Sequence, residues 1–229
     1  MERMIEQPPN IVDVQVGTFS MGGRENDKFV GRAELPRREI EITAKFGLGI
    51  IPVTEAEYEK FDREREAVST GLPVVNVSWH DATAYCEWLS AETGKRFRLP
   101  TEVEWEYAAR AGTDYIFQHG DTLSLEDACF LYDESGDRVG PGARVPGGSH
   151  RSNAFGLSDM IGNVGEWTAS AWTESLASDA LTDSSRQVVR GGAWDYMPRL
   201  LRISWRDGLA PETRRDNLGF RVLCEGADL

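Results

Sequence analysis

The chain has 229 residues, 40% of them hydrophobic and 28% charged, so it is long enough to bury a sizeable core. Acidic residues outnumber basic ones 38 to 25, and the formal net charge of −13 disfavours binding to nucleic acid or to anionic lipid. We therefore expect neither partner. The 23 glycines and 10 prolines are spread along the chain without an internal repeat or a composition shift, which indicates one irregular domain over residues 1–229.

Cysteine usage and the N-terminal segment favour a reduced, cytoplasmic protein. Cys86, Cys129 and Cys224 form no CxxC pair and no even-numbered framework, so neither a disulfide scaffold nor a zinc site is indicated. The first residues, MERMIEQPPN, lack the apolar run of a signal peptide, and no stretch approaches the length of a membrane span.

Strands are predicted at the start of the chain. Val12, Val14 and Val16 alternate with polar residues before a glycine turn, which is typical of a half-buried strand. The segment REIEITAKFGLGI repeats this alternation through Ile40 and Ile42.

Two helices should follow. The first begins at Thr54, because Thr54 and Glu57 have the spacing of a capping box. The second covers WHDATAYCEWLSAETGK, which carries one apolar stripe, and ends at Gly94 as a left-handed cap. The stripe consists of Ala82, Tyr85, Cys86 and Leu89.

A third helix is predicted within RLPTEVEWEYAARAG. It follows Pro100, has a second capping box from Thr101 to Glu104, and stops at Gly112. Its buried positions are Trp105, Ala108 and Ala109.

The C-terminal half is expected to contain loops and short strands. Nearly sixty residues after Thr113 carry scattered turn formers, and three runs rich in β-branched and aromatic residues then follow: RQVVRGGAW, RLLRISWRD and NLGFRVLCE. These runs should pair in an antiparallel sheet. The fold class is therefore α+β, with about three helices and a small antiparallel sheet.

Positive charge is concentrated at the C-terminal end, although the chain as a whole is acidic. The arginines of this region are Arg199, Arg202, Arg206, Arg214, Arg215 and Arg221. They predict either a basic surface patch or a set of internal ion pairs, because arginine suits buried pairing. The sequence leaves both open.

Four stretches, in order, resemble the sulfatase-modifying-factor family, whose founding activity is formylglycine generation. They are PVVNVSWHDATAYCEWLSAETGKRFRLPTEVEWEYAARAG, SNAFGLSDMIGNVGEW, VVRGGAW and DNLGFRVL, and the match is strongest over residues 72–223. The resemblance implies a single, irregular C-type-lectin-like domain of the formylglycine-generating-enzyme type.

The resemblance also implies what this chain lacks. Members that generate formylglycine carry two copper-binding cysteines in the loop after RGGS. Here Ala193 replaces the serine, and no cysteine occurs from Trp194 to Leu223. Tyr196 and Leu201 in this loop can neither bind cuprous copper nor take part in thiol redox chemistry. We therefore expect no copper and no formylglycine generation.

Another branch of the family, the sulfoxide synthases of the ergothioneine type, binds iron through histidines, and His80, His119 and His150 are too scattered here to suggest such a site. A third branch comprises the variable proteins of diversity-generating retroelements, whose binding surface corresponds to the stretch VVRGGAWDYMPRLLRISWRDG. The cysteine-free loop and the enrichment in tryptophan and arginine favour a non-catalytic module that binds a protein or peptide ligand, or a small molecule, through residues 193–215.

Tryptophan and arginine are enriched at binding hot spots, so Trp172 and Trp205 are candidate exposed anchors. The predicted ligand-binding residues are Trp194, Tyr196, Met197, Arg199, Leu201, Arg202, Trp205, Arg206, Glu212 and Arg214. Two alternatives remain: an oxidoreductase with non-copper chemistry, using Glu212, Asp207 or Tyr196 as acid or base, and a structural subunit of a larger complex.

The stretch IGNVGEW is the candidate metal loop. In the family the corresponding loop surrounds calcium, and the resemblance implies Asn163, the carbonyl of Val164 and Glu166 as ligands, since hard cations accept such oxygen donors. The alternative is a tight turn in which Asn163 adopts a positive φ and Glu166 pairs with an arginine.

Overall fold

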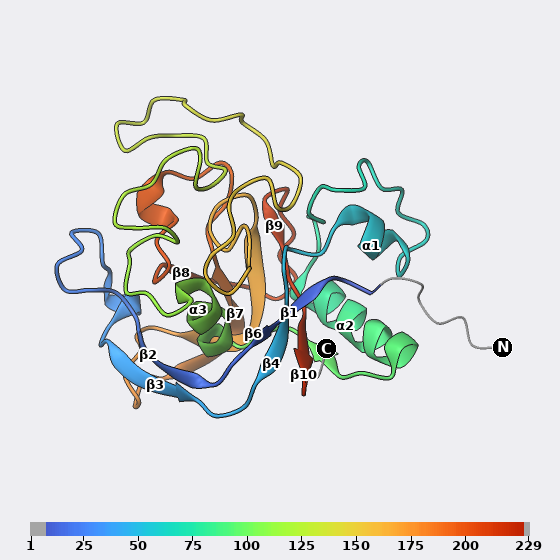
Figure 1. The fold of residues 1–229 in the computed structure, drawn as a ribbon, viewed down its shortest axis with the longest axis horizontal. Coiled ribbons are helices and arrows are strands. Elements are labelled where there is room, and N and C mark those ends of the chain that lie inside the picture. The colour runs from blue at the N-terminus through green and yellow to red at the C-terminus, as the bar shows by residue number, and fades with distance from the viewer. Residues whose placement is uncertain (1–7, 227–229) are drawn as a thin grey trace.

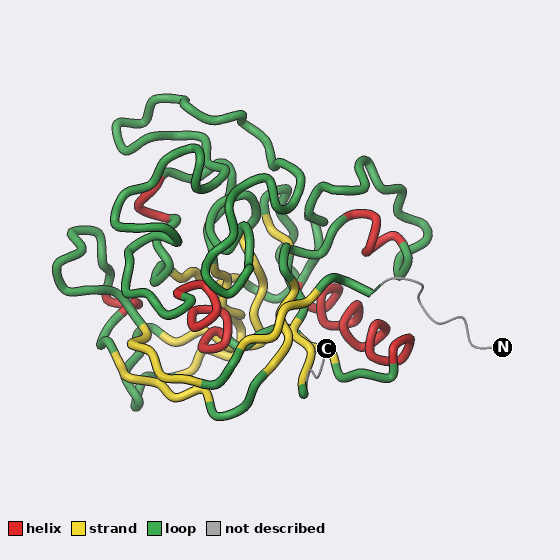
Figure 2. The backbone as a smooth tube through the Cα atoms, viewed as in Figure 1, coloured by secondary structure: helices red, strands yellow, loops and turns green. Residues whose placement is uncertain are grey.

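The computed structural model describes residues 8–226, and within this range it contains three α-helices, two short 3₁₀ turns and ten strands. The helices and 3₁₀ turns are α1 (Glu55–Glu59), α2 (Trp79–Thr93), α3 (Glu102–Arg110), η1 (Arg32–Glu34) and η2 (Pro198–Leu200). The strands are β1 (Ile11–Val14), β2 (Gly17–Met21), β3 (Arg38–Ile42), β4 (Phe46–Gly49), β5 (Phe97–Arg98), β6 (Gly165–Thr173), β7 (Thr182–Arg190), β8 (Arg206–Leu209), β9 (Leu218–Gly219) and β10 (Leu223–Glu225). Loops connect them over long distances, most of all between α3 and β6 (Figure 2).

Two four-stranded sheets and one hairpin organise the chain. The first sheet has the order β1-β4-β10-β5 and therefore joins the two ends of the chain, as Figure 1 shows near its centre. The second has the order β8-β7-β6-β9, in which β6 pairs antiparallel with β7 and parallel with β9. The hairpin is β2-β3.

The predicted helix signals are confirmed. The side chains of Thr54 and Thr101 accept hydrogen bonds from the backbone N–H groups of Glu57 and Glu104, and these carboxylates reach back to the cap residues. Helix α2 ends at Gly94 with φ of 69°, and its predicted stripe is buried. Helix α3 ends in a left-handed residue one position before the glycine that we predict as its stop.

The predicted C-terminal strands are only partly correct. The run RLLRISWRD is not a strand before Arg206, because its backbone forms η2 and a turn instead. Arg190 explains the difference: its guanidinium donates to the carbonyls of Ile203, Ser204 and Trp205, so a side chain satisfies groups that would otherwise need a neighbouring strand. The run NLGFRVLCE is split between the two sheets as β9 and β10.

The interior contains two apolar clusters. One surrounds Trp105 on α3 and includes Leu201 and Ile203, and the other surrounds Trp167 on β6 and receives the stripe of α2. No helix within residues 8–226 combines the length and the apolarity needed to cross a bilayer.

Candidate functional site

The loop after β7 presents an aromatic pair at the surface. The rings of Tyr196 and Trp205 meet edge to face, with centroids 5.7 Å apart, and both side chains are half-buried. Burial raises the pKa of the Tyr196 phenol, as do the nearby carboxylates of Asp207 and Asp195, whereas the Arg215 guanidinium opposes this rise. The hydroxyl of Tyr196 therefore stays protonated at neutral pH.

Trp205 separates two hollows of different size. The hollow on the side of Tyr196 is lined by Ala193, Tyr196, Trp205 and Arg215, among others, and its free volume is only about 10 Å³. On the other side, a hollow of about 300 Å³ lies between η1 and η2 and is lined by Phe29, Arg32, Arg199, Leu200 and Trp205. Only the second can admit a side chain of a ligand.

Two exposed arginines flank this larger hollow, which we call the Trp205 hollow. The Arg32 guanidinium has no hydrogen-bond or ion-pair partner among residues 8–226. Arg199 approaches one carboxylate oxygen of Glu134 at 4.0 Å, with its side chain 45% exposed. The edge of the hollow is thus positive on an otherwise acidic protein.

Three of the predicted ligand-binding residues are buried, and this part of the prediction is wrong. Leu201 is fully enclosed in the core. Arg202 donates to Asp27 at 2.9 Å and to both oxygens of Glu34, at 2.6 and 2.8 Å. Arg206 forms a bidentate ion pair with the carboxylate of Glu102 on α3, at 2.7 and 2.6 Å. These two arginines anchor the loop rather than face a ligand.

Trp172 is also buried, so it is not an exposed anchor. Its ring lies between the guanidinium groups of Arg186 and Arg206, at 4.8 and 4.7 Å from the ring centroid. Gly208 makes this packing possible, because a Cβ at that position would stand 2.6 Å from the indole.

The remaining predicted residues fall into two groups. Trp194 and Met197 are half-buried in the loop that carries Tyr196, and the backbone N–H of Trp194 donates to the carbonyl of Asn163. Glu212 and Arg214 contact the first turn of α2 instead. Arg214 pairs with Asp81 there, and Glu212 lies 3.8 Å from His80.

The side chains of the candidate metal loop are engaged by protein partners. Both oxygens of Glu166 accept from Arg221, and one also accepts from the Trp105 indole, at 2.8 Å. Asn163 has φ of 59° and uses its amide to bind the backbone of Val145. This geometry matches the alternative expectation, an arginine-paired turn, and it leaves neither oxygen of Glu166 without a protein partner. Calcium binding through Asn163, Val164 and Glu166 stays a prediction. No cluster of three or more His, Cys, Asp or Glu within residues 8–226 could hold a metal ion.

Comparison with known sequences identifies the family. The profile described as "Sulfatase-modifying factor enzyme 1-like domain" matches residues 1–225. The chain belongs to this family. The formylglycine-generating enzyme of Mycobacterium tuberculosis is 40% identical over a segment that covers 72% of this chain and 62% of that protein. The protein named "Inactive C-alpha-formylglycine-generating enzyme 2" of Bos taurus is 29% identical over 94% of this chain and 88% of its own length.

A solved structure extends the likeness to the fold. PvdO from Pseudomonas aeruginosa superposes with a TM-score of 0.84 and 28% identity, over 97% of each chain. The fold of this family member is therefore a single α+β domain of the C-type-lectin-like, formylglycine-generating-enzyme type, as the sequence predicts.

The three cysteines of this family member are buried and free, and none of them belongs to the loop after β7. Burial, with a smaller effect of the Asp159 carboxylate, raises the pKa of the Cys129 thiol to about 11. Burial also raises the pKa of Cys86 and of Cys224. None of these thiols is poised as a nucleophile or a soft metal ligand.

Two carboxylates that the sequence pattern did not indicate as functional hold the site together. Glu102 and Glu106 lie on the buried face of α3, where they meet Arg206 and Arg190 respectively. A signal was available, since both glutamates interrupt the apolar face that Trp105 and its neighbours define. Charged residues on a buried helix face need partners of opposite charge.

Proposed function

We propose that this protein is a non-catalytic binding module of the sulfatase-modifying-factor family. Its ligand is a protein or peptide, and the binding surface is the aromatic pair with the Trp205 hollow. The observation that carries the proposal is the packing of Tyr196 against Trp205. It occupies the loop in which the family resemblance implies copper-binding thiols for formylglycine-generating members, and it leaves about 10 Å³ of free space.

The side chains that line the Trp205 hollow favour a ligand that is both apolar and acidic. Phe29, Leu200 and Trp205 supply apolar surface, and Trp residues in such positions dominate binding energy. Arg32 supplies positive charge without a partner among residues 8–226, and the exposed Arg199 adds a guanidinium that is only weakly paired with Glu134. A peptide segment with an apolar side chain next to an aspartate or glutamate fits both features.

The oxidoreductase alternative has weaker support. Its candidate acid or base Tyr196 is a phenol whose pKa burial raises above the usual value, so it is a poor base at neutral pH. Glu212 is exposed and sits beside His80 rather than in an enclosed site.

A peptide selection tests the proposal. Random peptides displayed on phage are selected against the intact protein, and we expect enrichment of sequences that place an acidic residue next to an apolar one. Affinities of the enriched peptides are then measured by calorimetry for the protein and for a Trp205→Ala variant. Removal of the indole should weaken binding by about tenfold or more.

Arg32→Met should weaken the same peptides more mildly, by about fivefold, because an exposed ion pair is worth up to about 1 kcal/mol. Arg96→Met is the matched control, since Arg96 is an exposed arginine that pairs with Glu225 and does not line the Trp205 hollow. Equal affinity for the protein and the Trp205→Ala variant, or the lack of any enriched sequence, would refute the proposal.

A further inference from the structure

A separate cavity of about 570 Å³ lies beside the proposed binding surface. It is enclosed by the loop around residues 26–29, by residues 116–125 and 130–139, and by Pro198 of η2. In Figure 1 the short orange η2 turn is framed by the blue loop after β2 and by the green and yellow loops. A cavity of this size matches those that hold small molecules in proteins.

The lining of this cavity is mostly apolar and contributes part of the exposed apolar surface of the protein. Its main apolar side chains are Phe29, Ile116, Leu123, Leu125, Phe130 and Val139. Leu125 and Val139 come from different loops, yet they are 41% and 42% exposed at the same opening. Single exposed apolar side chains are common on protein surfaces, whereas several that share one concave site indicate a ligand-binding site.

The charges at the opening select the sign of the ligand. The lining contains four carboxylates and two cations. Arg202 is paired with two buried carboxylates. The Lys28 ammonium lies 4.7 Å from the centroid of the Phe29 ring, a contact that leaves its positive charge in place. The carboxylates of the lining still outnumber its cations.

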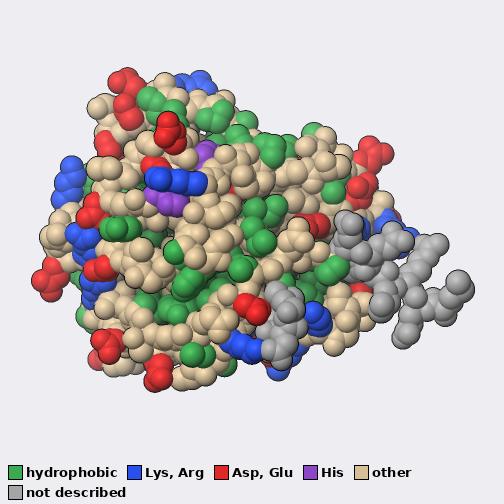
Figure 3. All heavy atoms as spheres, in the orientation of Figure 1, with side chains coloured by type: hydrophobic (Ala, Val, Ile, Leu, Met, Phe, Trp, Pro, Cys, Tyr) green, Lys and Arg blue, Asp and Glu red, His purple; other side chains and the backbone are tan. Residues whose placement is uncertain are grey.

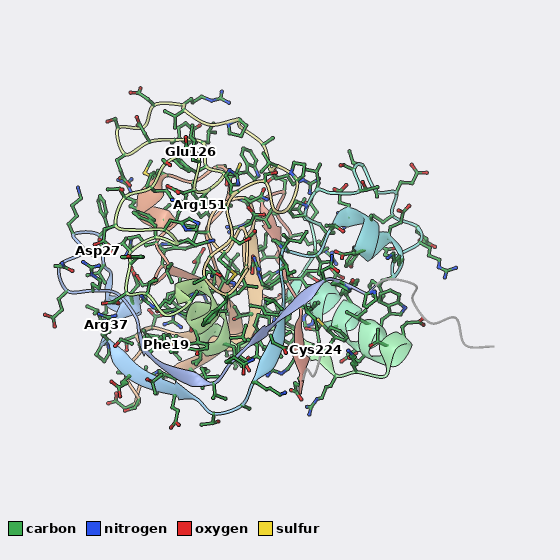
Figure 4. The ribbon with its side chains drawn as sticks, viewed as in Figure 1. Phe19, Asp27, Arg37, Glu126, Arg151 and Cys224 are labelled. Atoms are coloured by element: carbon green, nitrogen blue, oxygen red, sulfur yellow. The ribbon has the colours of Figure 1, made fainter. Side chains whose placement is uncertain are left out.

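Two of the four carboxylates are also engaged. Asp27, which Figure 4 labels on the blue loop, pairs with Arg202, and Asp121 pairs with Arg24.

The other two carboxylates are less fully compensated. Asp133 accepts only backbone N–H groups through one oxygen, without an arginine or lysine partner among residues 8–226. Glu134 accepts the backbone N–H of Arg199 at 2.6 Å, and its second oxygen lies 4.0 Å from the Arg199 guanidinium, so this ion pair is weak. Figure 3 shows acidic and basic side chains scattered over the face of the protein that it draws. An apolar site with one unpaired and one weakly paired carboxylate at its rim favours a ligand that is apolar and positively charged.

We propose that this cavity binds a small organic cation, with an apolar body among Phe29, Ile116 and Phe130 and an ammonium or guanidinium group near Asp133 and Glu134. The site is distinct from the Trp205 hollow, whose edge carries Arg32 without a partner among residues 8–226 and therefore favours the opposite charge. Only Phe29 and Arg202 contribute to both.

Three probes of equal size and different charge test this proposal: phenethylamine, phenethyl alcohol and phenylacetate. Each is titrated into the isotope-labelled protein, and backbone amide shifts are followed by NMR. Saturable shifts should centre on residues 26–29, 116–125 and 130–139. The amine should bind about fivefold more tightly than the alcohol, and the alcohol more tightly than the acid.

Variants then connect binding to the cavity. The double variant Asp133→Asn, Glu134→Gln keeps the hydrogen-bond acceptors and removes the charges, so the preference for the amine over the alcohol should disappear. Leu125→Lys should weaken the amine by about tenfold, through lost apolar contact and like charge. Leu181→Lys is the control, because Leu181 is 87% exposed and lies outside the cavity lining.

Three results would overturn the proposal: shifts centred outside the cavity loops, phenylacetate binding as tightly as phenethylamine, or an unchanged amine affinity in Leu125→Lys. All substitutions are at side chains that contact solvent, and the amide spectrum of each variant verifies its fold before titration.

Discussion

The arginines of the C-terminal region occupy two contrasting environments. Arg190, Arg202, Arg206 and Arg221 are at most 5% exposed, and each meets a carboxylate. Arg199 and Arg214 are exposed by 45% and 52% of their side chains. The same residue type therefore builds the interior of this region and faces solvent at its edge. A count of arginines overstates the binding surface.

The interior arginines compensate for irregular backbone. Arg221 donates to the carbonyl oxygens of Gly49, Ser158 and Asp159 in addition to Glu166, and Arg190 reaches three consecutive carbonyls. Loops without neighbouring strands leave such acceptors unpaired, and a buried acceptor needs a donor. A guanidinium supplies up to five donors at once.

The largest effect on the free energy of unfolding is expected when an interior arginine is replaced. Arg190→Met leaves Glu106 short of one ion-pair partner and leaves three buried carbonyls unsatisfied. We expect the free energy of unfolding to fall by about 3–5 kcal/mol, the usual loss when one member of a buried pair is deleted. Chemical denaturation at neutral pH measures the change.

Arg199→Met is the matched comparison at the edge of the molecule. It should change the free energy of unfolding by about 0.5 kcal/mol or less, as exposed substitutions usually do. Similar losses in the two variants would contradict the division into interior and exposed arginines.

A smaller effect is expected at a partly buried pair, and it depends on pH. Burial alone would raise the pKa of Glu104, but the Arg98 guanidinium and the N–H and hydroxyl of Thr101 outweigh burial and hold this pKa below its ordinary value. The folded state therefore binds the proton more weakly than the unfolded chain, so the stabilisation is present above pH of about 4.3 and is lost as the pH falls through the folded-state pKa.

Glu104→Gln should accordingly lower the free energy of unfolding by about 1–2 kcal/mol at pH 7, through the weakened capping box and ion pair. The difference between the variant and the wild type should shrink on acidification below pH of about 4. Urea denaturation over this pH range measures it, with the exposed Glu25→Gln as the control. A difference that grows at low pH would show that the direction of the pKa shift is wrong.

The sequence predicts the helices well because their signals are local. Thr54 and Thr101 begin helices through contacts three residues away, and Gly94 ends one through its own φ. The C-terminal strands depend on distant partners. Whether the residues around Ile203 extend or turn is decided by the guanidinium at position 190, which no pattern within the run reveals.

The same distinction explains the mixed outcome at the candidate site. Tyr196 and Trp205 meet at the surface, whereas Arg202 and Arg206 are turned inward by carboxylates on η1 and α3. Those acids are more than 100 residues away in the sequence. The hollow beside Trp205 also needs Phe29 from the N-terminal third, so no C-terminal motif could define it.

The smallest effect is expected when the folded protein is treated with a thiol reagent, because the native cysteines are buried, unlike the surface loop. With its pKa raised to about 11, Cys129 has only about one thiol in a thousand ionised at pH 8, and all three sulfur atoms are shielded from reagents. The native protein should therefore not react with an aromatic disulfide reagent within minutes, whereas all three thiols should react in guanidinium chloride.

Tyr196→Cys gives this measurement its positive control. The substitution places a thiol at a half-buried position of the loop after β7, and it should add one rapidly reacting thiol per chain. Rapid reaction of the wild-type protein would show that at least one native cysteine opens to solvent, and the contrast between interior and loop would then fail. If neither protein reacts, the loop itself is closed, and Tyr196 cannot belong to an accessible binding surface.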